Sequence, residues 1–214
     1  MVIAIDGPAG SGKSTVAKKI AKQLGIYFLN TGSFYRAYTL AQLERGLDPL
    51  DKESVLKTAE SVSITVVDGD IYLDGIDVES KLHTVYVDKY VSQVSSDPRL
   101  RSLVTEKARE ISEGLDLVTE GRDTTTVIFP NADYKFYLDA SAEVRAKRRY
   151  EEQKGQTDYD EILRSICERD KNDKEKPVGA LKIADNACYI DTSYLTIDQV
   201  CEKVVGAMQE HLAR

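Results

Sequence analysis

Residues 7–15 read GPAGSGKST and have the residue types and spacing of a loop that binds phosphate. Two glycines are followed directly by a lysine and a serine, which is the P-loop pattern. Glycines allow backbone N–H groups to surround phosphate oxygens, the lysine can bridge the β- and γ-phosphates, and the serine hydroxyl can bind Mg²⁺. We therefore predict a nucleotide site, with Mg²⁺ on Ser14, that comprises Gly7, Pro8, Ala9, Gly10, Ser11, Gly12, Lys13, Ser14 and Thr15. The alternative is a glycine turn that enters a helix beside an exposed lysine.

A cluster of basic residues lies further along the chain. Arg145, Arg148 and Arg149 are three and four positions apart, so a helix would place them on one face. They precede the polar, glycine-containing stretch YEEQKGQTDY at 150–159, which has the composition of a mobile flap. We interpret the three arginines as a phosphate clamp; the alternative is a solvated helix face paired with the two glutamates that follow.

Two more groups of polar residues are candidates for binding an anion. Arg169, Asp173 and Lys176 have helical spacing beyond the flap, although a surface salt bridge would explain that spacing equally well. Arg122 and Asp123, in the segment EGRD, follow an apolar strand, and ligands of open α/β sheets bind where such strands end. The glycine before them would let the chain turn sharply, so that both side chains point into a crevice.

The elements that must position these residues alternate between strand and helix. A strand at Val2–Asp6, a helix at Lys13–Leu24 that ends at Gly25, and a strand at Ile26–Asn30 form a βαβ unit, which implies a parallel sheet. The same alternation predicts a helix at 98–112, strands at 115–119 and 134–138, a helix from 141, a strand at 187–190, and a final helix that opens with a Thr196–Gln199 capping box. The fold class is therefore α/β, a P-loop fold with a central parallel sheet flanked by helices.

One segment breaks the alternation. Residues 62–78, VSITVVDGDIYLDGIDV, hold two Asp-Gly turns between short β-branched runs, which predicts a small antiparallel sheet. We expect one domain over 1–214, with an insertion at about 60–88 that binds an acceptor and a short lid at about 148–162.

Composition limits the partners that this chain can have. The chain has 214 residues and a net charge of −7, so it should repel nucleic acid and anionic membranes, and any anion site must be local. Three cysteines without a CxxC pair and two distant histidines argue against disulfides and structural zinc. No apolar run could span a membrane, and a cleaved signal would remove the glycine loop. We expect a cytoplasmic monomer.

Among P-loop proteins, the sequence favours a small phosphotransferase. It lacks the NKxD motif of a GTPase and is too short for a large motor ATPase. An inserted lobe and a basic flap suit an enzyme that closes over its substrates, because water competes with the acceptor for the transferred group.

The whole chain resembles the bacterial cytidylate kinase family of nucleoside monophosphate kinases. Beyond the P-loop, the resemblance rests on TGSFYRA at 31–37, VSQVSSDPRLR at 91–101, EGRDTTTVIFP at 120–130, KFYLDASAEVRAKRR at 135–149, and the segments ERDKNDKEKP and IDTSYLTIDQV. The resemblance implies transfer of the γ-phosphoryl group of ATP to CMP or dCMP with Mg²⁺.

The resemblance also implies roles for individual residues. Arg101 would read the cytosine, Arg122 would hold the acceptor phosphate, and Asp173 would hold the acceptor sugar. The acceptor-binding set is Thr31, Arg36, Arg101, Arg122, Asp123, Arg169, Asp173 and Lys176, and the catalytic set is Lys13, Arg122, Arg145, Arg149 and Arg169. No general base is expected, because an ionised phosphate is already a nucleophile.

The chain departs from the family pattern at four positions. Lys176 stands where arginine is usual, Thr125 replaces a glycine and should crowd a turn near the substrate, and Ala180 and Asn186 replace a proline and an aspartate. These departures bear on substrate preference, so a kinase for another acceptor such as UMP stays open. A catalytically silent nucleotide sensor is the alternative from another class, although two converging phosphate clamps argue against it.

Overall fold

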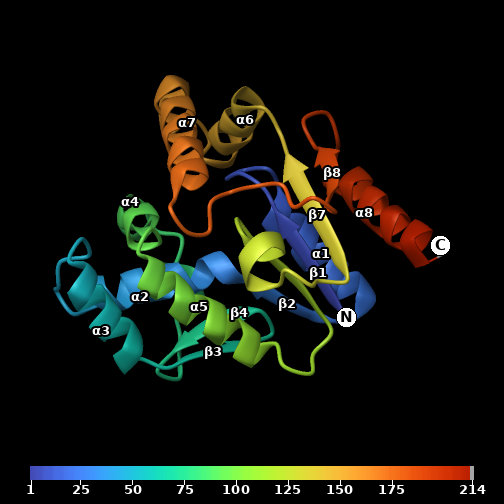
Figure 1. Ribbon diagram of the computed structural model, residues 1–214. Coiled ribbons are helices and arrows are strands. Elements are labelled where there is room, and N and C mark those ends of the chain that lie inside the picture. Colours follow the sequence, from blue (N-terminus) through green and yellow to red (C-terminus); the bar gives the residue numbers. More distant parts are fainter. Residues whose placement is uncertain (213–214) are drawn as a thin grey trace.

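The computed structural model describes residues 1–212, with side chains described as far as Glu210. Its centre is a five-stranded sheet in the order β2-β6-β1-β7-β8, in which every neighbouring pair is parallel (Figure 1). The strands are β1 (Val2–Asp6), β2 (Tyr27–Asn30), β6 (Leu117–Gly121), β7 (Tyr134–Asp139) and β8 (Cys188–Asp191). All five residues of β6 are buried, as expected for a strand covered on both faces.

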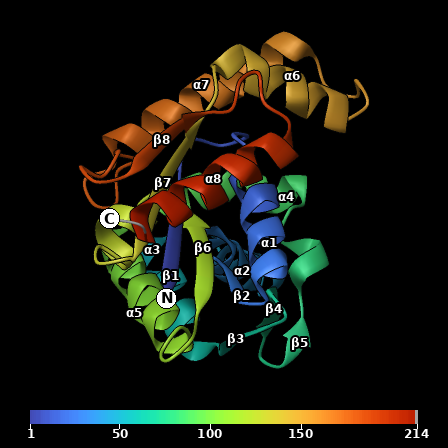
Figure 2. The ribbon, with the colours of Figure 1, turned by 90° about the vertical axis from the view of Figure 1, so that its right-hand side faces the viewer.

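Helices cover the two faces of this sheet and divide the core in two. On one face, α1 (Lys13–Leu24) and α8 (Ile197–Leu212) pack on side chains such as Ile5 and Val118 (Figure 2). On the other face, α2 (Thr31–Glu44), α3 (Lys52–Ser61), α4 (Val85–Val94) and α5 (Pro98–Ile111) share a core that includes Leu117. Leu117 and Val118 point to opposite cores because side chains alternate along a strand. The α/β class predicted from the alternation is confirmed.

Local signals in the sequence account for several helix starts. Asp97 accepts a hydrogen bond from the backbone N–H of Arg99 at the start of α5, and Ser141 caps α6 (Ala142–Glu152) in the same way. Thr196 and Gln199 exchange side-chain to backbone hydrogen bonds at the start of α8, so the predicted capping box is confirmed.

The segment that breaks the alternation forms a separate antiparallel sheet of β3 (Ile64–Val67), β4 (Asp70–Leu73) and β5 (Ile76–Asp77). Asp68 and Asp74 have φ of 54° and 51°, and the glycine after each is also left-handed, as type I′ turns require. The buried face of this sheet, including Ile64 and Ile71, belongs to the core beneath α2 to α5. A short turn, η1 (Glu79–Lys81), links it to α4.

The segment 142–175 forms a helical arm above the sheet (Figure 1). Helix α6 packs along α7 (Tyr159–Glu175), and the pair has a small core of its own made of Ala146, Ile162 and Ile166. At the tip, the rings of Tyr150 and Tyr159 meet edge to face with centroids 6.3 Å apart.

Apart from shifts of one residue at the ends of some elements, the observed elements differ from the predicted ones in two respects. Strand β6 begins at Leu117 instead of residue 115, because Leu115 ends a turn in which its N–H donates to Ser112. Helices α2, α3 and α4 were not predicted; α2 is buried nearly all round, so it has no amphipathic period to detect. Within the described residues, no helix has both the length and the apolar character needed to cross a bilayer.

Candidate active site

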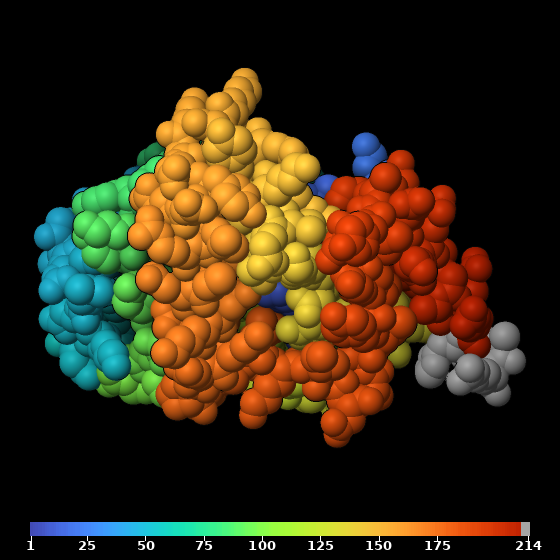
Figure 3. All heavy atoms as spheres, turned by 90° about the horizontal axis from the view of Figure 1, so that it is seen from above, coloured from blue at the N-terminus to red at the C-terminus, as the bar shows by residue number. Residues whose placement is uncertain are grey.

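A crevice of about 760 Å³ opens at the carboxyl edge of the parallel sheet. The P-loop forms one wall, α2 and α4 form another, and the α6–α7 arm lies above it. Seen from above, this arm (yellow to orange) lies between the segments of α3 to α5 (cyan to green) and the C-terminal segment (red) (Figure 3). Ligands of open α/β sheets bind at this edge, so the fold and the predicted site agree in position.

The P-loop packs closely against β7 and continues directly into α1. Gly7 has φ of 151°, and a Cβ there would collide with the carbonyl of Leu138, so only glycine fits. Lys13 lies in the first turn of α1, almost fully buried, and its Nζ donates to the carbonyl of Pro8 at 2.8 Å. Burial, and next the charge of Arg122, lower the pKa of Lys13 to about 7. A bound polyphosphate would reverse that shift because it favours the charged amine.

The oxygen atoms needed for a divalent cation lie next to the loop. Ser14 Oγ donates to Glu120 Oε1 at 2.7 Å, and both residues line the crevice. A hydroxyl and a carboxylate are the hard oxygen ligands that suit Mg²⁺, which retains several waters and contacts substrate phosphates. The donor set therefore fits the predicted ion. Glu120 was not predicted as a metal ligand; it lies near the end of the buried strand β6, beside the P-loop strand β1.

Arg36 approaches the crevice from α2. Its Nη1 donates to the carbonyl of Leu82 at 2.9 Å and lies 2.8 Å from Asp88 Oδ1. The second oxygen of Asp88 is 3.7 Å from Nη2 of Arg149, which comes from α6. A carboxylate on α4 thus joins the α2 wall to the helical arm in this structure.

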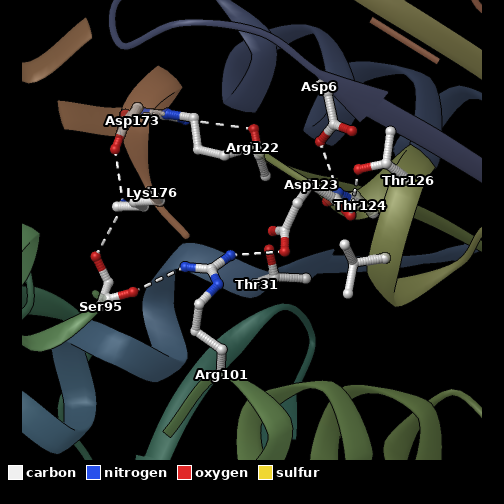
Figure 4. Close-up of polar contacts among 12 residues, drawn as sticks. Asp6, Thr31, Ser95, Arg101, Arg122, Asp123, Thr124, Thr126, Asp173 and Lys176 are labelled. Atoms are coloured by element: carbon white, nitrogen blue, oxygen red, sulfur yellow. Dashed lines mark hydrogen bonds and ion pairs between the residues drawn. The ribbon is translucent and has the colours of Figure 1, made fainter. Parts of the chain in front are cut away.

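Arg101, in the first turn of α5, is nearly buried and paired with Asp123 at 2.6 Å (Figure 4). Its Nη1 donates to the carbonyl of Ser95 at 2.9 Å, and its guanidinium lies over the ring of Tyr35 at 5.2 Å. Nε of Arg101 has no hydrogen-bond partner among the described residues. This nitrogen is buried, and Gly179 packs directly against it.

The carboxylate of Asp173 binds basic side chains from two segments of the chain. Its Oδ2 accepts from Arg122 Nε and its Oδ1 from Lys176 Nζ, each at 2.8 Å (Figure 4). Burial alone would raise the pKa of this carboxyl, but Arg122 and then Lys176 hold the pKa well below its usual range. The predicted pair Arg169 and Asp173 therefore lies beside Arg122, in the same part of the crevice.

Arg169 also lines the crevice, but its guanidinium is held by no hydrogen bond or ion pair within the described part of the chain. Burial, followed by the neighbouring charge of Arg122, lowers the pKa of Arg169 to about 10. A partly buried arginine without a counter-ion, next to Lys13 and Arg122, is arranged to receive an anion.

The arginines of α6 are largely occupied by protein groups. Arg145 donates to the P-loop carbonyl of Ala9 at 3.0 Å and forms a bidentate pair with Asp170 at 3.0 and 2.5 Å. Arg148 donates to the carbonyl of Thr192 at 2.6 Å. All three arginines of the predicted clamp line the crevice, and Arg145 also ties the helical arm to the P-loop.

Asp6, at the end of β1, anchors the turn that follows the EGRD segment. It is fully buried and accepts from the backbone N–H groups of Thr124 and Thr125 and from Thr125 Oγ1 at 2.6 Å. This turn is a single π-helical turn, η2 (Thr124–Ile128). The side chain of Thr125 points to Asp6 and is not among the residues that line the crevice.

The structure brings the predicted residues to one place. The crevice is lined by Ala9, Gly10, Lys13 and Ser14 of the loop and by Thr31, Arg36, Arg101, Arg122, Asp123, Arg145, Arg149, Arg169, Asp173 and Lys176. Five predicted P-loop residues are not among those that line it: Gly7, Pro8, Ser11 and Gly12, which precede α1, and Thr15, an exposed residue of the first turn of α1. Asn186 lies elsewhere, where its Oδ1 accepts from Lys135. Asp88, Ser95 and Glu120 were not predicted as site residues.

Comparison with known proteins identifies the family of this chain. The family model described as cytidylate kinase matches residues 3–210. A cytidylate kinase from Caldanaerobacter subterraneus subsp. tengcongensis is 42% identical over 98% of this chain and 95% of its own length. One from Fervidobacterium nodosum is 44% identical over 97% of this chain and 96% of its own.

Among solved structures, an uncharacterized protein from Eubacterium ventriosum has a TM-score of 0.55 at 13% identity, covering 98% of each chain. That likeness concerns the fold alone. The sequence matches extend over the P-loop, the segment that contains Arg36, and the segments that contain Arg122 and Asp173. The chain therefore belongs to the cytidylate kinase family.

Proposed function

We propose that this protein is an ATP-dependent cytidylate kinase that phosphorylates CMP or dCMP to give CDP or dCDP and ADP. The observation that carries the proposal is the arrangement of one crevice: Lys13 and Ser14 form its donor end, and Arg36, Arg101 and Arg122 form its acceptor end. Family membership supports the same reaction.

Transfer requires an oxygen of the acceptor phosphate to attack the γ-phosphorus while the bond to the β-phosphate oxygen breaks. The acceptor oxygen is already ionised near neutral pH, so the protein has to position two anions and offset their repulsion. Lys13, at the donor end, and its neighbours Arg122 and Arg169 supply positive charge. Arginine suits this task because its planar fork binds phosphate oxygens bidentately.

Other residues select and orient the substrates. Arg101 and Asp123, held together in a buried pair, would present a fixed donor and acceptor to the cytosine edge. Asp173, kept ionised by Arg122 and Lys176, would accept hydrogen bonds from the acceptor sugar. Ser14 and Glu120 would hold Mg²⁺, which when bound neutralises phosphate charge. Arg145 and Arg149 would bring the arm over the phosphates.

The decisive test is a coupled ADP-release assay with ATP, Mg²⁺ and a panel of nucleoside monophosphates. We expect turnover with CMP and dCMP above all others. Preferred turnover of UMP would assign a different acceptor, and inactivity with every monophosphate would favour a nucleotide sensor. Cytoplasmic location and a monomeric state belong to the proposal, and sedimentation would test the latter.

Arg36→Ala tests the acceptor end of the crevice. The variant should lose the charge-assisted hydrogen bonds from Arg36 to the acceptor phosphate, which contribute about 1.5–3 kcal/mol to transition-state binding. We therefore expect kcat/KM for CMP to fall about 10- to 100-fold while the KM for ATP stays unchanged. Arg45→Ala is a matched control, because Arg45 follows the same helix and donates to Ser61 away from the crevice. If Arg36→Ala kept wild-type efficiency with CMP, the acceptor end would be wrongly assigned.

A further inference from the structure

Ser95 lies at the junction of the two buried ion pairs on the acceptor side of the crevice. Arg101 pairs with Asp123 and Lys176 pairs with Asp173, and the side chains of all four are at most 7% exposed. Ser95 touches both cations: its carbonyl accepts from Arg101 Nη1 at 2.9 Å, and its Oγ accepts from Lys176 Nζ at 3.1 Å (Figure 4).

The position of Ser95 at the carboxyl end of α4 explains why two cations converge there. Ser95 is the C-cap residue of α4, and its N–H donates back to Val91. The last carbonyls of a helix lack intrahelical partners and carry a partial negative charge, which favours cations. Its hydroxyl donates to the carbonyl of Ser92 at 3.0 Å, so the oxygen lone pairs face Lys176.

Lys176 depends on this hydroxyl because it has few other partners. Its ammonium group carries three donors, and the contacts to Asp173 and Ser95 are its only hydrogen bonds among the described residues. If the Ser95 hydroxyl is removed, the buried ammonium group either stays in place with an unsatisfied donor, which is unfavourable, or moves toward another acceptor. Since Lys176 also fixes Oδ1 of Asp173, such a movement would reach the carboxylate that the proposed function assigns to the acceptor sugar.

We propose that Ser95 is a positioning residue for the acceptor nucleotide, acting through Lys176 and Asp173. The inference rests on the proposed function, in that Asp173 and Lys176 are taken to bind the acceptor. It adds a residue of α4, outside the P-loop, the EGRD segment and the helical arm, to the machinery that sets acceptor affinity. The donor end of the crevice is not involved.

The experiment compares Ser95→Ala with Ser96→Ala in steady-state kinetics with CMP and ATP. Ser96 is a matched control, because its hydroxyl makes the same kind of bond to a carbonyl three residues earlier, that of Gln93, and it does not line the crevice. We expect Ser95→Ala to raise the KM for CMP about tenfold, as for a lost hydrogen bond to a charged group, with kcat and the KM for ATP within about twofold of wild type. Ser96→Ala should match wild type.

A double-mutant cycle with Lys176→Ala shows whether the hydroxyl acts through the ammonium. In the Lys176→Ala background, Ser95→Ala should change the KM for CMP by less than about twofold, because the partner of the hydroxyl is gone. The proposal is overturned if Ser95→Ala leaves the KM for CMP unchanged, or if its effect is equally large without Lys176. It is also overturned if kcat and both KM values change together, as a general folding defect would produce. Failure of the proposed function is a separate result: the wild-type protein would then phosphorylate no CMP at all.

Discussion

Lys13 lies in an environment that favours the binding of an anion. Its ammonium group is buried and, among residues 1–210, has the carbonyl of Pro8 as its one hydrogen-bond acceptor, while Arg122 and Arg169 add positive charge nearby. Without phosphate, the charged form is costly, and the pKa falls to about 7. Nucleotide binding and protonation of this side chain must therefore be coupled.

The coupling predicts a pH dependence of ATP binding. Above pH 7 the free protein holds Lys13 mostly neutral, and bound triphosphate raises the pKa again, so binding at pH 8 should take up close to one proton. The Kd for ATP should then increase as pH rises from 7 to 9, by at most about tenfold per pH unit. Calorimetry at pH 8 in buffers of different ionisation enthalpy measures the uptake. Lys13→Arg stays charged throughout and should abolish it; zero uptake by the wild type would contradict the prediction.

Several site residues could be predicted from the sequence and others could not, for a physical reason. The roles of Lys13 and Ser14 follow from a local pattern, because the loop binds phosphate with its own backbone. Asp6 and Ser95 act on residues that lie far away in sequence: Asp6 binds Thr124, 118 positions on, and Ser95 binds Lys176, 81 positions on. The spacing of residues within one local segment does not indicate contacts between residues so far apart in the sequence.

At the scale of elements, the loop after α7 closes the acceptor side of the crevice. Leu181 N–H donates to the carbonyl of Asp173, which folds the loop back on the helix. Gly179 then lies against the Arg101–Asp123 pair with φ of 67°, and a Cβ at that position would collide with both side chains. The loop has no space for a larger residue unless the pair moves.

Gly179→Ala should therefore damage acceptor recognition. The pair would have to shift, so we expect the KM for CMP to rise about tenfold or more while the Kd for ATP stays constant. Gly46→Ala is a matched control, because Gly46 has φ of 69° with nothing within 4 Å of an added Cβ. Both variants carry the backbone cost of about 1 kcal/mol, and only Gly179→Ala carries the collision. Equal KM values for the two variants would show that the loop does not support the pair.

The elements themselves were predictable where their signals are local. The Asp-Gly turns at 68–69 and 74–75 have the left-handed backbone that their sequence favours, and the predicted capping box forms at the start of α8. The predicted start of β6, at residue 115, is too early, because the apolar run begins before the residues that pair with β1. The first residue of β6 that pairs with β1 is Leu117. Pairing, which sequence periodicity does not show, sets that boundary.

At the scale of the whole molecule, a net charge of −7 coexists with a crevice lined by Arg36, Arg122 and Arg169. The crevice is lined by nine basic and six acidic side chains, so it has an excess of positive charge although the chain as a whole is anionic. Without substrates, this concentration of like charge works against the folded state, and bound nucleotides should relieve it.

Ligand binding should accordingly stabilise the protein. At 100 times its Kd, a non-hydrolysable ATP analogue should add about 2.7 kcal/mol, which for a chain of this size raises Tm by about 5–10 °C. CMP should add a further increase, since it binds the other end of the crevice. Differential scanning fluorimetry measures both shifts, and Lys13→Ala should lose the response to the analogue while keeping that to CMP. A response to CMP that disappears with Lys13 would argue against two separate ends.

The place of β1 in the sheet has a consequence for folding. This strand carries the P-loop and lies in the middle of the sheet, between β6 and β7, with Val2 opposite Leu117. As the chain leaves the ribosome, β1 therefore waits unpaired until more than half of the 214 residues have followed. Contacts so distant in sequence slow folding and leave an apolar strand exposed to other chains. We therefore expect a chaperone that assists folding to bind residues 2–6 of the nascent chain. Nucleotide can stabilise the folding chain only after β6 has paired with β1.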